Sequence, residues 1–435
     1  MSVIIPWWAA LIGLAVAIIL ILKKLNPVYS LILGAIIGAL IGGAGLADTV
    51  NLVVKGTQSV MGTVVRVLAA GMLAGVMMES GAADTIARAI IDKLGDKLAI
   101  LSLALASMII TAVGVFIPVT VLIIAPIALE VGRRLNISKL ALIVALSGGG
   151  KAGNIISPNA NTIAAAKGFG LQLNQVMMVD FVPALFALAA TVIVANLIKH
   201  KGSPVLDEDL QNLDEAPDQP NVLPSLGTSL VAPIVAIVLL LLSPIGTLLH
   251  INCLANIHID AMYALPIAAI IGALAMKQGK KLRHFAMTGV SRMTDVVLIL
   301  IGAGAIGATI TSSDLPAQLI HLVKVLHVPG VLLAPLSGLL MSAATASTST
   351  GVILATKSFS KAILGFGVSP LAAAAMVHTS ATIIDQLPQG NYFHVTANAM
   401  HMDIKERSQA MLYETCSGLA STIVATVLYG FMHLV

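Results

Sequence analysis

The chain has 435 residues, of which 58% are hydrophobic and 10% are charged, and its mean hydropathy is +0.99. Because soluble domains carry about 25% charged residues, this composition excludes a water-soluble globule and requires lipid to cover the apolar surface. The formal net charge of +4 reflects how Lys and Arg are distributed about a membrane, so no nucleic-acid partner is expected. Two cysteines do not make a disulfide framework or a metal cluster, and we predict no metal site.

The first half of the chain contains apolar segments that can cross a bilayer, at about 20 residues per crossing. The first segment lacks the basic n-region of a signal peptide, so it is predicted to remain as a helix. Charged and aliphatic residues share 83–94, which indicates an amphipathic helix at the membrane surface. Two segments are interrupted, the fifth near Gly114 and the sixth over 147–154. The predicted segments are 3–22, 27–43, 62–78, 83–94, 98–131, 140–166 and 176–197.

A polar stretch separates two membrane halves. Residues 199–221 contain three prolines and six acidic side chains, and no packed element is expected there. We therefore divide the chain into a first membrane half (1–199), a polar cytoplasmic linker (200–226) and a second membrane half (227–435). The second half repeats the element order of the first, including its amphipathic and interrupted segments. Its predicted segments are 230–249, 261–276, 296–311, 315–326, 331–356, 370–400 and 410–434.

Two short sequence matches relate the halves. Residues 36–40 recur as 270–274 at an offset of 234, and 157–161 match 387–391 at an offset of 230. Two matches at nearly one offset, together with the same element order, indicate an internal repeat.

The distribution of basic residues predicts the topology. If each interrupted run before the broken helix is a re-entrant hairpin, each half has five crossings, and this odd number inverts the second half. Placing the termini outside then puts sixteen Lys and Arg on the inner side and five on the other, as the positive-inside rule requires. The predicted fold is an all-α polytopic membrane protein with two inverted repeats of about five transmembrane helices, each containing a re-entrant hairpin and a broken helix.

Interrupted helices in inverted halves place a binding site near the bilayer midplane. Pro158 and Pro388 stop helices, and the half-helices that resume after them present partly positive N-termini to the gap, which suits an anionic substrate. Lys151 is predicted to pair with a substrate carboxylate or a nearby acid, the alternative being a lysine that snorkels to the surface. The candidate substrate-binding residues are Lys151, Asn154, Ser157, Asn159, Asn161, Thr345, Ser347, Thr348, Gln389 and Asn391.

Two further titratable residues are candidates for ion coupling. Asp385 is the second midplane charge, and it would bind a proton or sodium, or form a static pair with Lys151. His378 could relay protons at neutral pH, although a lone histidine near a polar helix face is more often structural. Apart from the coupling ion, predicted to be a proton with Na⁺ as the alternative, we expect no cofactor.

Enzyme motifs are missing from the sequence. It contains no HExxH, GxSxG or Walker pattern, and Gly150-Lys151 is followed by Ala152 where Ser or Thr would be needed. We therefore predict that the chain is not an enzyme.

Several short motifs resemble the gluconate permease (GntP-type) family, and the likeness in element order covers nearly the whole chain. The resemblance implies proton-coupled uptake of gluconate or a related hydroxy-carboxylate. It also implies a scaffold, a moving transport domain with two hairpins, elevator-type motion and a homodimer. The motifs are 75–87 with 93–95, Pro118 with 122–129, 345–351 and 385–390.

The predicted function is therefore ion-coupled symport of a small organic anion across the bacterial inner membrane, with lipid around the helices and both termini outside. Family members tend to carry a His/Pro-rich run in the first break, where this chain has 157–162, so proton and sodium both stay open. The alternatives are a sodium-coupled di- or tricarboxylate transporter and a cation/proton antiporter. A channel and an intramembrane enzyme are further rivals.

Overall fold

The computed structural model describes residues 5–23, 25–211, 223–248, 251, 253, 257, 259–315, 317–318, 321, 325, 329–388 and 390–435. Over these residues the protein is all-helical, and the β-structure consists of a single bridge between Ile5 and Ser313.

The helices of the two halves follow the same order along the chain. Those of the first half are α1 (Trp7–Leu22), α2 (Pro27–Ile41), α3 (Leu46–Gln58), α4 (Met61–Glu79), α5 (Ala82–Leu94), α6 (Ala99–Ala112), α7 (Ile117–Leu135), α8 (Lys139–Ile155), α9 (Ala160–Gly168), α10 (Leu173–Val179) and α11 (Phe181–Leu197). The short helices α12 (Asp207–Gln211) and α13 (Leu226–Ser229) follow. Those of the second half are α14 (Val231–Leu248), α16 (Ala261–Ala275), α17 (Leu282–Arg292), α18 (Thr294–Thr311), α20 (Leu333–Thr345), α21 (Thr348–Gly365), α22 (Pro370–Ser380), α23 (Asn391–Ala399) and α24 (Ile404–Ala425), which ends in a π-helical turn, η5 (Thr426–Phe431).

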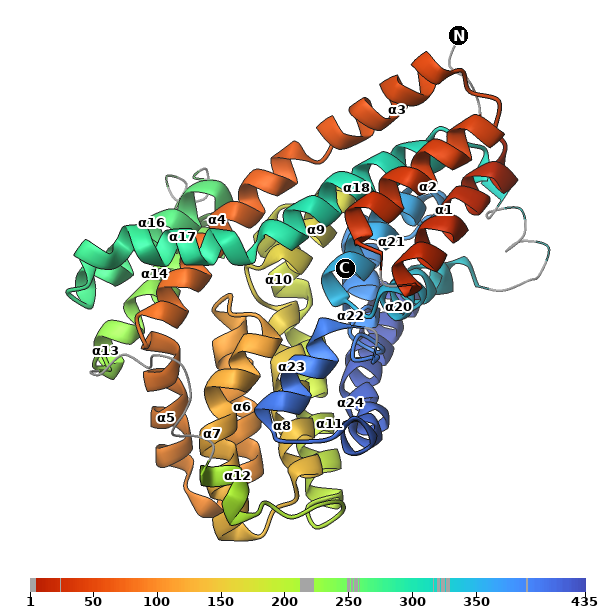
Figure 1. The fold of residues 1–435 in the computed structure, drawn as a ribbon. Helices are drawn as coiled ribbons and strands as arrows, with labels where there is room; N and C mark the ends of the chain where they lie inside the picture. Colours follow the sequence, from red (N-terminus) through yellow and green to blue (C-terminus); the bar gives the residue numbers. More distant parts are fainter. Residues whose placement is uncertain are drawn as a thin grey trace.

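Eight helices form a framework that runs across one side of the molecule. The continuous α3–α4 stretch packs against α17 and α18, and both stretches cross the view diagonally in Figure 1. Helices α1 and α2 lie against α18 at one end, and α16 lies against α4 at the other, with α14 packed on α16. We call α1–α4, α14 and α16–α18 the framework.

Glycines bring the framework backbones into direct contact. A Cβ atom added at Gly56 would lie 2.3 Å from the carbonyl oxygen of Gly304, and one added at Gly289 would lie 2.0 Å from that of Gly71. Only residues without a side chain allow helices to approach this closely. Gly56 and Gly289 are 233 positions apart, as are Gly71 and Gly304, so the two crossings, each between the halves, are made by equivalent positions.

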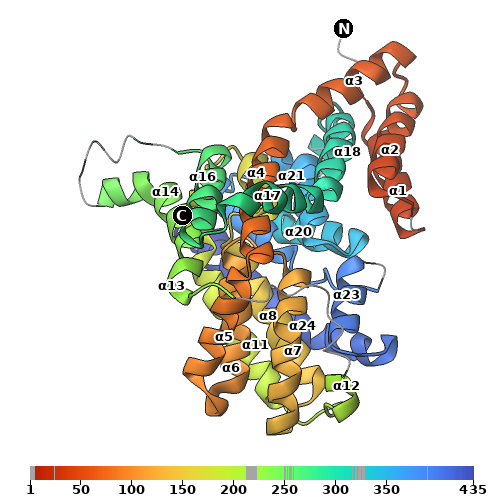
Figure 2. The same cartoon turned by 60° about the vertical axis from the view of Figure 1, so that its left-hand side comes forward.

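Helices α6–α11 and α20–α24 form what we call the body. Of these, α6, α7, α8, α11, α23 and α24 lie below the framework in Figure 2, and α21 lies beside α18. Two helical hairpins belong to the body, as the sequence predicted. Helices α6 and α7 meet at 113–116, where Gly114 has φ 110°, and α20 and α21 meet at 346–347, where Ala346 has φ 48°. The first residues of α7, α8, α9 and α10 recur 231 positions later as the first residues of α21, α22, α23 and α24.

The interruption predicted over 147–154 is wrong. Helix α8 continues through this glycine run to Ile155, and the chain breaks only at 156–159. The glycines serve close packing instead: a Cβ atom at Gly149 would lie 2.1 Å from the carbonyl oxygen of Ala104, and one at Gly153 would lie 2.0 Å from that of Met108. Both neighbours belong to α6, so small residues let α6 and α8 touch without unwinding either helix.

Other differences concern elements that the sequence did not indicate. Helices α3 and α17 were not predicted, and α24 begins at Ile404, six residues before the predicted segment. The predicted linker contains a packed element, because α12 holds Asp209, whose carboxylate accepts a bond from Lys139 Nζ at 2.7 Å. Residues 212–222 and much of the amphipathic segment predicted at 315–326 lie outside the described residues.

The described helices are consistent with several crossings of a membrane. Three are long and apolar enough to span one: 46–79, Thr294–Thr311 and 404–431. The number rises to six if each bent pair, α5–α6, α8–α9 and α10–α11, is one span. The amphipathic α5 was predicted correctly as a helix, and it is followed by a 104° bend. Helices such as α2, with 15 residues, are about 22 Å long and fall short of a bilayer core of roughly 30 Å.

The framework crossings predict an effect of side-chain size. Gly289→Ala should lower stability by about 1–3 kcal/mol, because the new methyl group collides with backbone that cannot rotate away. Gly227→Ala is the control, since nothing lies within 4 Å of its added Cβ atom. The measurement is the melting temperature of the detergent-solubilised protein, and equal melting of the two variants would contradict backbone contact at the crossing.

Candidate functional site

Two helix breaks and one hairpin tip converge inside the body. The breaks are 156–159, between α8 and α9, and 381–390, between α22 and α23. The start of α21 joins them, because the Ser349 hydroxyl donates to Asn161 Oδ1 at the first break and the Thr348 hydroxyl donates to Asp385 Oδ2 in the second. The structure therefore brings together segments of the two halves that are roughly 200 residues apart in sequence.

Lys151 is the cation at this convergence. Its Nζ lies 2.8 Å from Asp385 Oδ1, donates to the Thr382 carbonyl oxygen at 2.7 Å and donates to Gln386 Oε1 at 2.7 Å. The Lys151 and Asp385 side chains are 1% and 5% exposed, so water does not screen the pair. The Thr382 carbonyl follows the end of α22, where the break leaves it without a helical partner. Lys151 thus satisfies a group that the opposite break exposes.

Asn159 closes the first break. Its Oδ1 accepts from the backbone N–H groups of Asn161 and Thr162 at 2.9 and 3.2 Å, which makes it the N-cap of α9. Its Nδ2 donates to the carbonyl and side-chain oxygens of Asn154 at 2.9 and 2.6 Å. Asn159 therefore ties the end of α8 to the start of α9. The Ser157 hydroxyl is buried nearby and has no hydrogen-bond partner.

The remaining predicted substrate residues have different surroundings. Ser347 caps α21 by accepting from the Thr350 N–H, and the Thr345 hydroxyl bonds back to the Met341 carbonyl oxygen at 2.8 Å, so both hydroxyls serve the hairpin itself. Asn391 is exposed at the first turn of α23. Gln389 lies outside the described residues.

His378 does not face Asp385 but pairs with Asp180, a residue that the sequence analysis overlooked. His378 Nδ1 lies 2.7 Å from Asp180 Oδ2, and both side chains are fully buried. His378 Nε2 and Asp180 Oδ1 have no hydrogen-bond partner. Asp180 sits at the 45° bend between α10 and α11. Its position as the one acid within the apolar segment 176–197 was the signal that could have revealed it.

A second buried ion pair fixes the second half of the body. Arg407 donates to both carboxylate oxygens of Glu414, at 2.8 and 3.0 Å, and to the Thr396 hydroxyl at 2.9 Å. Its guanidinium also stacks over the Phe393 ring at 5.2 Å. The side chains of both Arg407 and Glu414 are fully buried. The cluster braces α23 against α24.

The chemistry of the convergence suits an organic anion better than a metal. Within the described ranges, no group of three or more His, Cys, Asp or Glu side chains could hold a metal ion. The site instead offers one ammonium group, the N-termini of two helices, and hydroxyl and amide groups, among them Ser157 and Asn161. Such groups bind carboxylates and hydroxyls.

Comparison with known proteins decides the family. A model of the GntP family permeases matches residues 5–433. The chain belongs to this permease family. It is 47% identical to an "uncharacterized transporter" of Haemophilus influenzae, over 97% of both chains. It is 26% identical to the D-serine transporter DsdX of Escherichia coli, over 80% of both, and 25% identical to a gluconate permease of Pseudomonas aeruginosa, over 79% of both.

A solved structure shares the fold of this GntP-family chain. The YdaH transporter of Alcanivorax borkumensis matches with a TM-score of 0.59 and 14% identity, covering 89% of this chain and 90% of that one. The GntP family and its named members are transporters, so this chain is a permease and not an enzyme. Together with its apolar helices, this supports a multi-pass membrane protein, as the sequence indicated.

The Lys151–Asp385 pair predicts a non-additive effect on stability. Lys151→Met or Asp385→Asn alone should cost about 3–5 kcal/mol, because each leaves a buried charge without its partner. The double variant removes both charges and should regain much of that loss. Melting temperatures in detergent measure the effect, with Arg133→Met as the control because the Arg133–Asp207 pair is exposed and contributes little to stability. Additive losses would show that the two charges do not interact.

Proposed function

We propose that this permease is a secondary active transporter that carries a small organic anion, such as gluconate or a related hydroxy-carboxylate, together with a proton. The supporting observation is the buried Lys151–Asp385 pair at the convergence of two helix breaks. A buried ionisable pair in a membrane protein is costly and usually serves transport, which favours a functional role over a purely structural one.

The site favours an anion for two reasons. Helices α9 and α21 both begin there, with Asn159 and Ser347 as their N-caps, and helix N-termini attract negative charge. Lys151 adds a full positive charge that Asp385 neutralises in this arrangement. Two relatives are named for gluconate and for D-serine, and both of these molecules carry a carboxylate beside a carbon with a polar substituent. We propose the same chemical class for this chain.

If Lys151 changed its partner from Asp385 to the substrate carboxylate, transport of the anion would be coupled to transport of a proton. Protonation of Asp385 removes its charge and leaves the Lys151 ammonium free to bind a substrate carboxylate. The proton and the anion then enter together, and the net charge of the site does not change. An empty site restores the Lys151–Asp385 pair and is electrically neutral too. Asn154, Ser157 and Asn161 are the groups we propose for the substrate hydroxyls.

We further propose that the two halves are inverted repeats and that the body moves past the framework, as in an elevator. The matching offsets of 231 and 233 positions support the repeat. The contacts between the two units are unequal: α21 packs against α18, whereas its counterpart α7 has no comparable contact with α4. The body therefore lies closer to one half of the framework. If the body packed against the other half instead, the transport site would face the other side of the membrane.

The orientation and assembly are proposals of the same kind. The C-terminal end of α7, the start of α8 and the residues after α11 meet, since the Ser138 N–H donates to the Lys199 carbonyl oxygen. Lys139, Arg133 and Arg134 lie at this end of the body. Such a cluster of basic residues favours the inner side of the bacterial inner membrane, with the termini outside. A homodimer joined through the framework would hold it still while each body moves.

Uptake into proteoliposomes tests the proposed function. Labelled gluconate should accumulate when the outside is more acidic, and a panel of other hydroxy-carboxylates, di- and tricarboxylates and D-serine should rank the substrates, with and without sodium. The double variant Lys151→Met/Asp385→Asn should not transport even where it folds stably, while Arg133→Met should transport normally. Wild-type rates in the double variant would reduce the pair to a structural role. Sodium dependence without pH dependence would favour a sodium-coupled transporter, and sodium-driven pH change without substrate would favour an antiporter.

The proton carrier can be tested with two matched carboxylates of the body. Asp385→Asn imitates the protonated side chain and leaves Lys151 charged, so exchange of internal for external substrate should persist while dependence on the pH gradient disappears. Asp180→Asn removes a second buried carboxylate, the one paired with His378, and serves as the control. Loss of pH dependence in Asp180→Asn alone would move the proton to the His378–Asp180 pair.

A further inference from the structure

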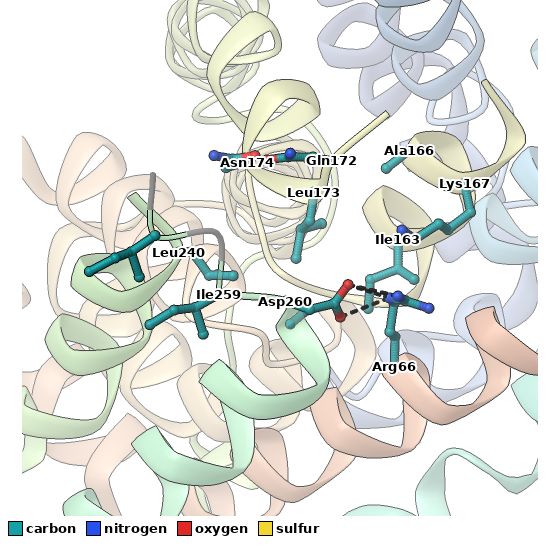
Figure 3. Close-up of a pocket in the computed structure, with 12 residues that line it drawn as sticks. Arg66, Ile163, Ala166, Lys167, Gln172, Leu173, Asn174, Leu240, Ile259 and Asp260 are labelled. Atoms are coloured by element: carbon teal, nitrogen blue, oxygen red, sulfur yellow. Dashed lines mark hydrogen bonds and ion pairs between the residues drawn. The ribbon is translucent and has the colours of Figure 1, made fainter. Parts of the chain in front are cut away.

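A cavity of about 270 Å³ lies where the framework meets the body. Its framework wall comes from α4 and the segment that leads into α16, and its body wall comes from the end of α9 and the start of α10 (Figure 3). None of the residues proposed for the transport site lines it.

The cavity carries an excess positive charge. On the framework side, Arg66 Nε and Nη2 donate to the Asp260 carboxylate at 2.8 and 2.7 Å, so this pair is neutral. On the body side, Lys167 in the last turn of α9 lines the same space, and none of the ion pairs among the described residues includes it. Among the described residues of the lining, two cations and one carboxylate leave one positive charge, and the body wall contributes no acid to balance it.

Arg66 also has donors to spare. Its Nη1 donates to the Gly62 carbonyl oxygen, and three of its five N–H groups are used in all. Asp260 holds the guanidinium in place and is itself fixed as the N-cap of α16, where it accepts from the Met262 N–H at 3.0 Å. The remaining two N–H groups can bind an incoming carboxylate without displacing Asp260.

The rest of the lining is mainly aliphatic. Leu173 points into the space from the start of α10, and Ile163 and Leu240 contribute further apolar surface (Figure 3). A charged end beside an apolar wall fits an organic anion with a carbon chain better than a bare inorganic ion.

We infer that this cavity is a second binding site for small organic monocarboxylates. Arg66 and Lys167 would bind the carboxylate, and the aliphatic side chains would contact the carbon chain. Helix α9 would connect this site to the proposed transport site. Asn161 lies in its first turn, and Lys167 lies about 9 Å further along its axis. Since the walls belong to both units, an occupant stabilises the present arrangement of framework and body.

Binding of gluconate to the double variant Lys151→Met/Asp385→Asn isolates the cavity, because that variant has lost the charged pair of the transport site. Calorimetry at constant ionic strength should detect weak residual binding. Adding Lys167→Gln should weaken it by about fivefold, as expected for one lost charge–charge contact. Lys55→Gln on α3 is the matched control, since Lys55 is exposed like Lys167 but does not line the cavity, and its loss should change nothing. Asp260→Asn should strengthen binding, because asparagine keeps the helix cap and removes the competing carboxylate.

The outcomes separate this inference from the proposed function. Equal binding by the Lys167→Gln and Lys55→Gln variants, an equal response to chloride, or no binding by the double variant while the wild type binds would each overturn the cavity as a carboxylate site. Equal binding by the wild type and the double variant, sensitive to Lys167→Gln, would uphold the cavity and remove Lys151 from substrate binding. A response to anionic lipid vesicles in place of gluconate would assign the cavity to a lipid and overturn the inference.

Discussion

The arrangement of the body depends on how the ammonium group of Lys151 is satisfied. A buried lysine is stable only when another charge and further acceptors surround it. Here the acceptors are supplied by the opposite half of the chain: the Asp385 carboxylate, the Thr382 carbonyl oxygen and the Gln386 amide. The second break is therefore required for the charge on α8, and the charge in turn satisfies the backbone that the break exposes. The two halves therefore meet where each alone would leave a buried polar group without a partner.

Around this pair, the structure separates rigid parts from parts that can rearrange. The framework helices touch backbone to backbone at Gly56–Gly304 and Gly71–Gly289, so these crossings depend on backbone atoms that cannot change rotamer. In the body, capping side chains hold the start of α9 after the first break and the start of α21 at the hairpin tip: Asn159 and Ser347. Changes of partner at the site therefore involve side chains and short segments, while the helices that carry them keep their geometry.

Much of this could be predicted from sequence, because the signals were local. Pro158 and Pro388 mark both breaks, the hydroxyl-rich run 345–351 marks a hairpin tip, and Lys151 and Asp385 are charges in apolar surroundings. The glycine run before the first break was misleading, since glycine permits both an unwound segment and a close helix contact, and only the presence of α6 decides between them.

Pairings between distant residues were beyond local reasoning. Asp180 meets His378 in the interior, and this pairing cannot be read from spacing, because it depends on how the helices pack. Arg407 and Glu414 lie seven residues apart on one face of α24, and what the sequence does not show is that this face is buried. For the same reason, the sequence could not show that the hydroxyl groups of the hairpin have two different kinds of partner. Thr345 and Ser347 are used by their own hairpin, whereas Thr348 and Ser349 reach across to the breaks.

The repeat has a consequence for the pair at the centre of the body. Counting 231 positions onward from Lys151 leads to Thr382, and counting 231 back from Asp385 leads to Asn154. The lysine and the aspartate are thus not equivalent positions, and each has a neutral counterpart. Two separate copies of a single half could not hold this pair, because two first halves would place each Lys151 opposite Asn154, and two second halves would place each Asp385 opposite Thr382. A single chain that contains both halves can place different side chains on the two sides of the binding site. A substrate with two different ends would therefore bind in one orientation only.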